Sequence, residues 1–250
     1  MFQASWDEIE IQDRSEYKQR MYDVLTIDPA STAVVTIDMQ RNYLDPAIGA
    51  LPVLAEDAAH VVSSAEDMLR LVRSYSIPVI HVYTVRRKVE IDRGFFMAGV
   101  ALMQAGISRK VSQLPHAGVS DLPDRLEGSP QSNLVESLVH PDDLHLTTKR
   151  TMDPFQYTEL DLLLQRVYKV DTVILTGINT DTCVYSAAFS AANRGLKTIV
   201  VSDCVASSRG RDSHSMALEV MSRSIAWVLT VEQLSQKLGK PGLAKPASKA

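Results

Sequence analysis

The feature that most constrains the fold is a series of short, β-branched apolar runs that alternate with segments of helical spacing. Six runs have the composition of strands, at residues 32–39, 77–84, 144–149, 172–178, 198–203 and 224–230. Helical spacing is found at residues 55–74, 158–168, 182–194 and 214–222. Most of the runs are almost continuously apolar, which is typical of strands covered on both faces. The alternation predicts a three-layer α/β/α, doubly wound fold with a mainly parallel sheet of about six strands.

The chain length and the polar segments predict one domain with extensions. A chain of 250 residues with 45% hydrophobic content is sufficient for a single α/β core, which we assign to residues 31–235. Residues 1–30 precede the first strand and form an N-terminal extension, expected to pack against the body or a neighbouring subunit. Residues 85–143 form a long excursion, expected to act as a lid or an oligomer contact. Residues 236–250, rich in Lys, Pro and Ala, predict a flexible tail.

Composition favours a small-molecule partner. Lys and Arg total 26 against 30 for Asp and Glu, a formal net charge of −4 that offers no broad attraction for nucleic acid or anionic lipid. No apolar run reaches the roughly 18 residues of a membrane span, and the acidic N-terminus does not have the pattern of a signal peptide. We therefore expect a cytoplasmic protein that binds neither nucleic acid nor membrane.

Three residues whose side chains can take part in catalysis lie at or just after the ends of predicted strands. Asp38 ends the first run, Lys149 ends the third, and Cys183 comes just after the fourth, where a helix is predicted to start. In open α/β sheets, ligands bind beyond the carboxyl ends of the strands. Each residue alone is more often structural, since a lone cysteine is usually a small core residue and a strand-end Lys is usually solvated. Their joint placement at one sheet edge strengthens the prediction of a catalytic role for all three.

Cys183 has the sequence context of an activated nucleophile. We expect Thr180 or Asp181 to cap the helix, with the sulfur in its first turn, where the helix dipole lowers the pKa of a thiol. Asp38 is the candidate base, and Lys149 is expected to hold its carboxylate and the developing charge. The other cysteine, Cys204, follows an apolar strand without such a context and is interpreted as a packing residue.

The chain resembles the isochorismatase-like cysteine hydrolases, which include N-carbamoylsarcosine amidases and ureidoacrylate and biuret hydrolases. The resemblance extends from about residue 32 to residue 230. It is carried by three motifs, Val35-Thr36-Ile37-Asp38-Met39-Gln40, Thr148-Lys149 with Phe155 and Thr158-Glu159-Leu160, and Gly177-Ile178-Asn179-Thr180-Asp181-Thr182-Cys183-Val184.

The resemblance implies a catalytic triad of Asp38, Lys149 and Cys183. It also implies a cis peptide bond between Ile178 and Asn179, and an oxyanion hole made by the backbone N–H groups of Asn179 and Cys183. The implied activity is hydrolysis of a C–N bond in a small amide, carbamoyl or ureido compound through a thioester-type intermediate, without a cofactor.

Two departures from relatives in the family narrow the prediction. Nicotinamidases carry an Asp-x-His metal cluster after the second strand, whereas this segment has His81 alone, so no metal site is expected. Isochorismatases lack the nucleophilic cysteine that is present here. C–N hydrolysis is therefore preferred, and an isochorismatase-type vinyl-ether hydrolase or a catalytically silent scaffold remains as the alternative.

Substrate-binding candidates come from the motifs and from arginines near the strand ends. The carbamoylsarcosine-type enzymes use an arginine after the fifth strand to hold a carboxylate, and Arg209 falls within about one position of it. A solvated surface side chain is the competing interpretation for each arginine, as a satisfied hydrogen-bonding group is for Tyr43 and His214. The resemblance also predicts a homodimer or homotetramer. The candidates are Gln40, Tyr43, Arg86, Arg87, Phe155, Arg209 and Arg211.

Overall fold

The computed structural model describes residues 11–93 and 125–239 and contains one sheet of six parallel strands. The strand order is β3-β2-β1-β4-β5-β6, with every neighbouring pair parallel. The strands are β1 (Thr32–Ile37), β2 (Val79–Val82), β3 (Leu144–Leu146), β4 (Thr172–Ile178), β5 (Lys197–Ala206) and β6 (Trp227–Leu229). The predicted three-layer parallel fold is confirmed.

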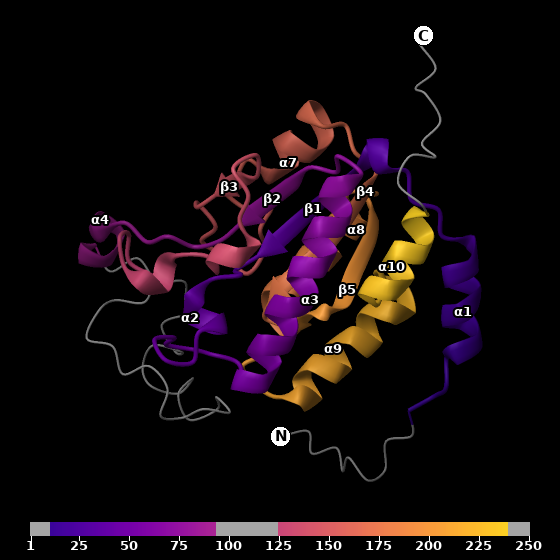
Figure 1. Cartoon of the computed structure of the whole chain (residues 1–250), viewed down its shortest axis with the longest axis horizontal. Helices are drawn as coiled ribbons and strands as arrows, with labels where there is room; N and C mark the ends of the chain where they lie inside the picture. Colours follow the sequence, from indigo (N-terminus) through magenta and orange to yellow (C-terminus); the bar gives the residue numbers. More distant parts are fainter. Residues whose placement is uncertain (1–10, 94–124, 240–250) are drawn as a thin grey trace.

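Helices cover both faces of the sheet, with α3 and α10 on the side facing the viewer in Figure 1. The α-helices are α1 (Ser15–Val24), α2 (Arg41–Leu44), α3 (Ala55–Ser74), α4 (Lys88–Asp92), α7 (Leu160–Leu162), α8 (Tyr185–Asn193), α9 (Arg211–Ser224) and α10 (Val231–Leu238). Two π-helical turns accompany them, η6 (Leu163–Val167) after α7 and η7 (Thr180–Val184) before α8. No helix in the described ranges is both long and apolar enough to span a membrane.

The central strands β1 and β4 lie entirely in the core. All six residues of β1 and all seven of β4 are buried, as the continuous apolar runs predict for strands covered on both faces. Alternate residues serve two separate cores. Val34 and Ile174 pack with α3 and α10, whereas Val35 and Leu175 pack with α7 and α8. The centre of the sheet is therefore a rigid support for side chains at its edge.

Some helices and strands extend beyond the bounds predicted from the sequence. Residues 55–74 form α3 as predicted. The helix predicted over residues 214–222 extends from Arg211 to Ser224, and the fifth strand continues to Ala206. The last helix, α10, ends at Leu238, a buried residue three positions beyond the predicted domain boundary. A Thr230 capping box with Gln233 begins this helix.

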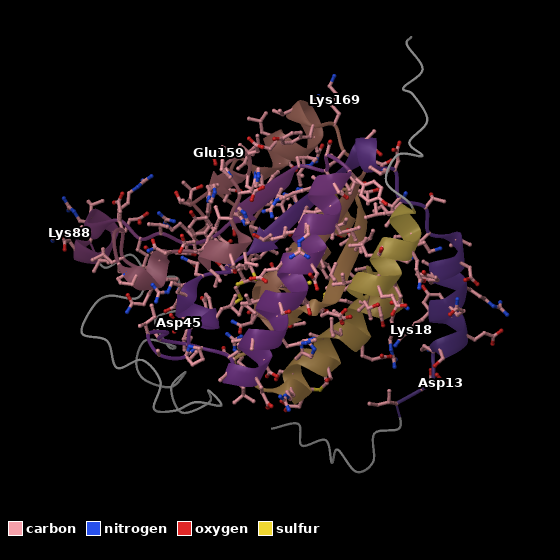
Figure 2. The ribbon with its side chains drawn as sticks, in the orientation of Figure 1. Asp13, Lys18, Asp45, Lys88, Glu159 and Lys169 are labelled. Atoms are coloured by element: carbon pink, nitrogen blue, oxygen red, sulfur yellow. The ribbon has the colours of Figure 1, made fainter. Side chains whose placement is uncertain are left out.

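The N-terminal helix α1 packs against the body of its own chain. Figure 2 shows Lys18 directed from α1 toward the rest of the chain, where its Nζ pairs with Glu219 of α9. The indole N–H of Trp227 donates to the Met21 carbonyl oxygen at 2.8 Å, which ties α1 to the edge strand β6. No residue of α1 is fully buried, but Tyr22 packs against the core, so apolar and polar contacts together hold the helix in place.

The returning limb of the long excursion lies along α2. The amide of Arg41 donates to the Asn133 carbonyl oxygen at 2.9 Å, and that of Val135 donates to the Met39 carbonyl oxygen at 3.1 Å. Residues 94–124, which include the Gly94-Phe95-Phe96 segment, lie outside the described residues, so the lid prediction stays a prediction. The described limb brings residues 125–135 to the carboxyl end of β1.

A buried polar network joins β1, β2 and the start of β3 to the end of α3. Asp143 accepts hydrogen bonds from Arg73 Nη2 at 2.5 Å, from the His140 amide at 2.9 Å and from His81 Nε2 at 3.0 Å. On its other side, His81 Nδ1 lies 2.6 Å from the Thr36 hydroxyl. Burial opposes ionisation of Asp143, but the bonds from His81, Arg73 and the His140 amide outweigh it and lower its pKa to about 2.

We expect Asp143→Asn to destabilise the fold at neutral pH and to flatten its acid sensitivity. The pKa of this carboxyl is depressed on folding, so its contribution exists above the unfolded value of about 3.9 and is lost as pH falls toward 2. The loss at pH 7 is expected to be on the order of 1–2 kcal/mol of unfolding free energy. Urea denaturation at pH 7 and pH 3 measures it. Asp142→Asn, at a neighbouring carboxylate that is 91% exposed, is the control, and equal losses in both variants would contradict the prediction.

Candidate active site

Lys149 joins Asp38 and Cys183 in one buried cluster at the carboxyl ends of the strands. Its Nζ lies 2.6 Å from Asp38 Oδ2 and 3.3 Å from Cys183 Sγ. All three residues are at least nine-tenths buried. The ammonium nitrogen of one of the three predicted residues is therefore within hydrogen-bond distance of the other two.

Asp38 is held where the chain leaves β1. Its φ of 51° lies in the left-handed region, which Asp tolerates better than most residues, and its amide donates to the Val82 carbonyl oxygen at 3.0 Å. The carboxylate oxygen Oδ2 is bound by Lys149, whereas Oδ1 is buried and accepts no hydrogen bond from the residues that the structure describes. Asp38 thus keeps one acceptor available for a proton.

The backbone of Lys149 is fixed just after β3. Its carbonyl oxygen accepts hydrogen bonds from the Thr84 hydroxyl at 3.0 Å and from Arg150 Nη1 at 3.1 Å. Arg150 is itself paired with Glu90 of α4 at 2.8 Å. The backbone from which the ammonium group extends is therefore held by Thr84, which follows β2, and by Arg150, and a fixed backbone favours a preorganised position for the charge.

Cys183 lies in the π-helical turn η7, and the structure corrects the predicted capping of this turn. The N-cap is Asn179, without a side-chain cap bond. Thr180 instead contacts His214 Nδ1 at 2.9 Å, and Asp181 accepts a bond from the Ser207 hydroxyl at 2.7 Å. Thr180 bonds to α9 and Asp181 to the loop between β5 and α9, because the fold brings both segments against the turn.

The turn begins at a cis peptide bond between Ile178 and Asn179, the geometry that the family resemblance implies. Just before it, Gly177 has a φ of 127°, and a Cβ atom there would lie 2.0 Å from the Ile37 carbonyl oxygen. Only glycine permits β4 to approach the end of β1 so closely. The Asn179 side chain accepts a hydrogen bond from the Ser208 amide at 2.8 Å, which ties the start of the turn to the β5–α9 loop.

Electrostatics in the cluster favour a neutral thiol beside a charged ammonium. Burial is the largest influence on the Cys183 thiol and raises its pKa, with Lys149 lowering it and Asp38 raising it further. The predicted lowering of the thiol pKa by the helix dipole is therefore wrong, because desolvation prevails. For Lys149, burial lowers the pKa, but attraction to the Asp38 carboxylate, with smaller contributions from Cys183 and Tyr43, outweighs it and raises the pKa above its ordinary value. A resting thiol needs a base to ionise.

The four candidate arginines have different surroundings. Arg211, with its side chain 59% exposed, pairs with Glu56 and Asp57 at the start of α3. Arg87 is exposed at the start of α4, and the backbone N–H of Arg86 donates to the Arg125 carbonyl oxygen at 2.8 Å.

The contacts of Arg209 lead through Thr182 to the nucleophile. Its Nη1 lies 3.3 Å from the Thr182 hydroxyl, which is 4.0 Å from Cys183 Sγ. Of the four candidate arginines, it is the one that these contacts place beside the cluster.

The remaining candidates are buried near the cluster. Gln40 donates both of its described amide bonds to carbonyl oxygens, those of Thr84 at 2.9 Å and Ser132 at 2.8 Å, so its role is to join loops. The Tyr43 hydroxyl accepts a bond from Arg125 Nη1 at 2.5 Å. Phe155 packs in the same apolar cluster as Cys183, with Arg194 over its ring at 4.3 Å. Their contact with substrate stays a prediction.

Several residues at the site were missed by the sequence analysis. Arg125 is buried beside Tyr43, and no local pattern marks a buried arginine within a long excursion. Asp181, Ser207 and Thr182 also contact one another or Arg209 around the nucleophile turn. The polar run Ser207-Ser208-Arg209 after β5 was the available signal, since polar residues after a parallel strand lie at the ligand edge. Within residues 11–93 and 125–239, no group of three His, Cys, Asp or Glu side chains is arranged to hold a metal ion.

Comparison with known proteins is consistent across sequence and structure. The isochorismatase domain family model matches residues 32–233. Maleamate amidohydrolase of Pseudomonas putida is 27% identical over 206 residues, covering 82% of this chain and 86% of that protein. Ureidoacrylate amidohydrolase of Methylobacterium radiotolerans is 26% identical, with 88% and 84% covered. A cysteine hydrolase structure from Pseudomonas syringae has a TM-score of 0.70 at 23% identity, with 86% and 95% covered.

Proposed function

Because the chain belongs to the isochorismatase family of hydrolases, with amidohydrolases among its relatives, we propose that it is a cysteine-dependent amidohydrolase with Asp38, Lys149 and Cys183 as its catalytic triad. The observation that carries the proposal is the contact of one ammonium nitrogen with both the Asp38 carboxylate and the Cys183 sulfur. A buried cation between a base and a thiol stabilises both the carboxylate and the thiolate.

In the first half of the reaction, Asp38 accepts the proton of the Cys183 thiol and the thiolate attacks the amide carbonyl carbon. A C–S bond forms, and the carbonyl electron pair moves onto oxygen. The backbone N–H groups of Asn179 and Cys183 are the proposed donors to this oxyanion. When the intermediate collapses, the C–N bond breaks, and ammonia or an amine leaves with the proton from Asp38.

In the second half, water releases the acid from the thioester. Asp38 accepts a proton from the attacking water, the new C–O bond forms, and the C–S bond breaks. The sulfur then recovers a proton, and the resting thiol is restored. Asp38 is suited to both proton transfers because its Oδ1 accepts no hydrogen bond in the described part of the chain.

We propose that the substrate carries a carboxylate next to the amide or ureido group. Arg209 uses only Nη1 for its side-chain hydrogen bonds to described residues, which leaves the edge formed by Nε and Nη2 for a ligand. Two parallel N–H donors match the two oxygens of a carboxylate. Two relatives are named for maleamate and ureidoacrylate. Both compounds are carboxylates, which agrees with a substrate that carries a carboxylate.

A substrate panel tests the proposed function. Maleamate, ureidoacrylate, N-carbamoyl amino acids, biuret, nicotinamide and isochorismate are incubated with the protein, with and without EDTA. The expected result is release of ammonia from at least one amide or ureido acid, with a thioester adduct at Cys183 in intact-mass spectra. Turnover of isochorismate without ammonia release would support the vinyl-ether alternative, and no turnover or adduct with any compound would support a silent scaffold.

We also propose a homodimer or homotetramer. Large apolar side chains remain exposed on α8 and α9, with Phe189 at 49%, Val220 at 46% and Met216 at 40%. Neighbouring exposed apolar residues are typical of contact surfaces between subunits. Light scattering is expected to give at least twice the 27.6 kDa of one chain, and a monomer mass would contradict the proposal.

A further inference from the structure

We propose that Asp181 is a positioning residue, which orients Arg209 so that its free edge receives the substrate carboxylate. The inference rests on the proposed function and assigns a task to a side chain that does not itself touch the reacting atoms. Asp181 belongs to the nucleophile turn η7, two residues before Cys183, whereas Arg209 belongs to the loop between β5 and α9.

Asp181 contacts two residues of that loop, Ser207 and Arg209, which also contact each other. Its Oδ1 accepts a bond from the Ser207 hydroxyl at 2.7 Å, and Arg209 Nη1 lies 3.4 Å from Oδ1 and 3.5 Å from Oδ2. The Ser207 hydroxyl oxygen also accepts a bond from the Arg209 amide at 3.1 Å. The Asp181 carboxylate therefore holds Arg209 in two ways. It contacts the guanidinium directly, and it contacts the backbone amide through the Ser207 hydroxyl.

These distances indicate that Asp181 orients the Arg209 guanidinium without forming a close ion pair with it. At 3.4–3.5 Å the pair is longer than a charge-assisted hydrogen bond, which is typically about 2.7–2.9 Å. Asp181 thus uses only one nitrogen of the guanidinium, and the Nε–Nη2 edge keeps its donors for an incoming anion. The side chains of Asp181 and Arg209 are 16% and 27% exposed, so both are partly accessible to solvent.

A further contact of Arg209, with Thr182, connects the guanidinium to the turn that carries the nucleophile. Nη1 lies 3.3 Å from the Thr182 hydroxyl, which in turn lies 4.0 Å from Cys183 Sγ. Asp181 and Thr182 precede the cysteine directly, so the orientation of the guanidinium follows the turn that carries the sulfur. A substrate held by its carboxylate is in this way aligned with the attacking atom.

A comparison of two substrates tests the inference. Maleamate carries a carboxylate, whereas its methyl ester has the same amide without the charge. In Asp181→Asn, which keeps an acceptor for Ser207 but loses the charge, the ratio of kcat/KM for maleamate to that for the ester is expected to fall about 10-fold, mainly through the KM of maleamate. Ser207→Ala is expected to lower the ratio in the same direction. Asp212→Asn, at an exposed carboxylate in the first turn of α9, is the charge-matched control and should leave the ratio unchanged.

An unchanged ratio in Asp181→Asn would overturn the inference, as would an equal fall in kcat on both substrates, which would assign Asp181 to support of the Cys183 turn. A binding measurement separates this failure from that of the proposed function. Maleate is expected to protect Cys183 from iodoacetamide in the wild-type protein, and about 10-fold more maleate is expected to be needed in Asp181→Asn. Equal protection would overturn the inference even if neither substrate is hydrolysed.

Discussion

Replacement of Cys183 by alanine or serine is expected to abolish turnover and preserve the fold. Alanine removes the atom that forms the covalent bond, and the serine hydroxyl has a pKa too high for Asp38 to ionise it comparably. We expect kcat to fall by about 10⁴-fold or more, the scale seen when the nucleophile of a triad is removed. Ammonia release and intact-mass detection of the acyl adduct measure the effect, with thermal unfolding to verify the fold.

Cys204→Ala is the matched control for the nucleophile. Cys204 is fully buried at the end of β5, and burial raises its pKa, so it is expected to remain unmodified by iodoacetamide. The variant should retain wild-type kcat within a factor of about two, since it lacks contact with the cluster. Wild-type rates in Cys183→Ala, or loss of activity in Cys204→Ala alone, would end the assignment of Cys183 as the nucleophile.

Replacement of Lys149 by methionine is expected to lower the rate by about 10²-fold or more, in line with the loss of a preorganised electrostatic group. Lys149 lowers the pKa of the Cys183 thiol, so its removal reduces the thiolate fraction. Alkylation of Cys183 by iodoacetamide should therefore slow as well. Stopped assays of ammonia release and the alkylation rate at several pH values provide the two measurements.

The Lys149 prediction needs a control for stability, because the variant leaves the Asp38 carboxylate buried without its partner. The double variant Asp38→Asn, Lys149→Met removes both charges and is expected to recover stability without recovering activity. Lys169→Met, at an exposed lysine labelled in Figure 2, should leave the rate, the alkylation and the stability unchanged. If Lys149→Met behaved like Lys169→Met, Lys149 would have no part in the chemistry.

The strands and the positions of Asp38, Lys149 and Cys183 could be predicted because they depend on local patterns. A β-branched apolar run such as Thr172–Ile178 is typical of a buried strand, and parallel strands end at a common edge. The order of the strands could not be predicted in this way. Pairing of β1 with both β2 and β4 results from contacts between residues more than 40 positions apart, for which no local signal exists.

The Cys183 thiol shows how a residue singled out from the sequence can be given the wrong electrostatics. Its place just after β4 predicted a helix start and a lowered pKa, both local effects. The structure adds burial from all sides and the nearby Asp38 carboxylate, and these raise the pKa. Desolvation depends on the neighbours that tertiary packing brings, so the sequence alone does not give its size.

Apolar periodicity and chain direction were sufficient to predict a parallel sheet and to bring Asp38, Lys149 and Cys183 to one edge of it. The resemblance placed Arg209 near a carboxylate-binding position and left Arg211, two residues away, as a further candidate, and the contacts of the folded chain separate the two. Arg211 meets Asp57 and Glu56, which lie about 150 positions earlier in the chain, whereas Arg209 meets Asp181 and Thr182 of the nucleophile turn. A long charged side chain takes its role from the partners that folding brings within reach, and those partners are distant in sequence.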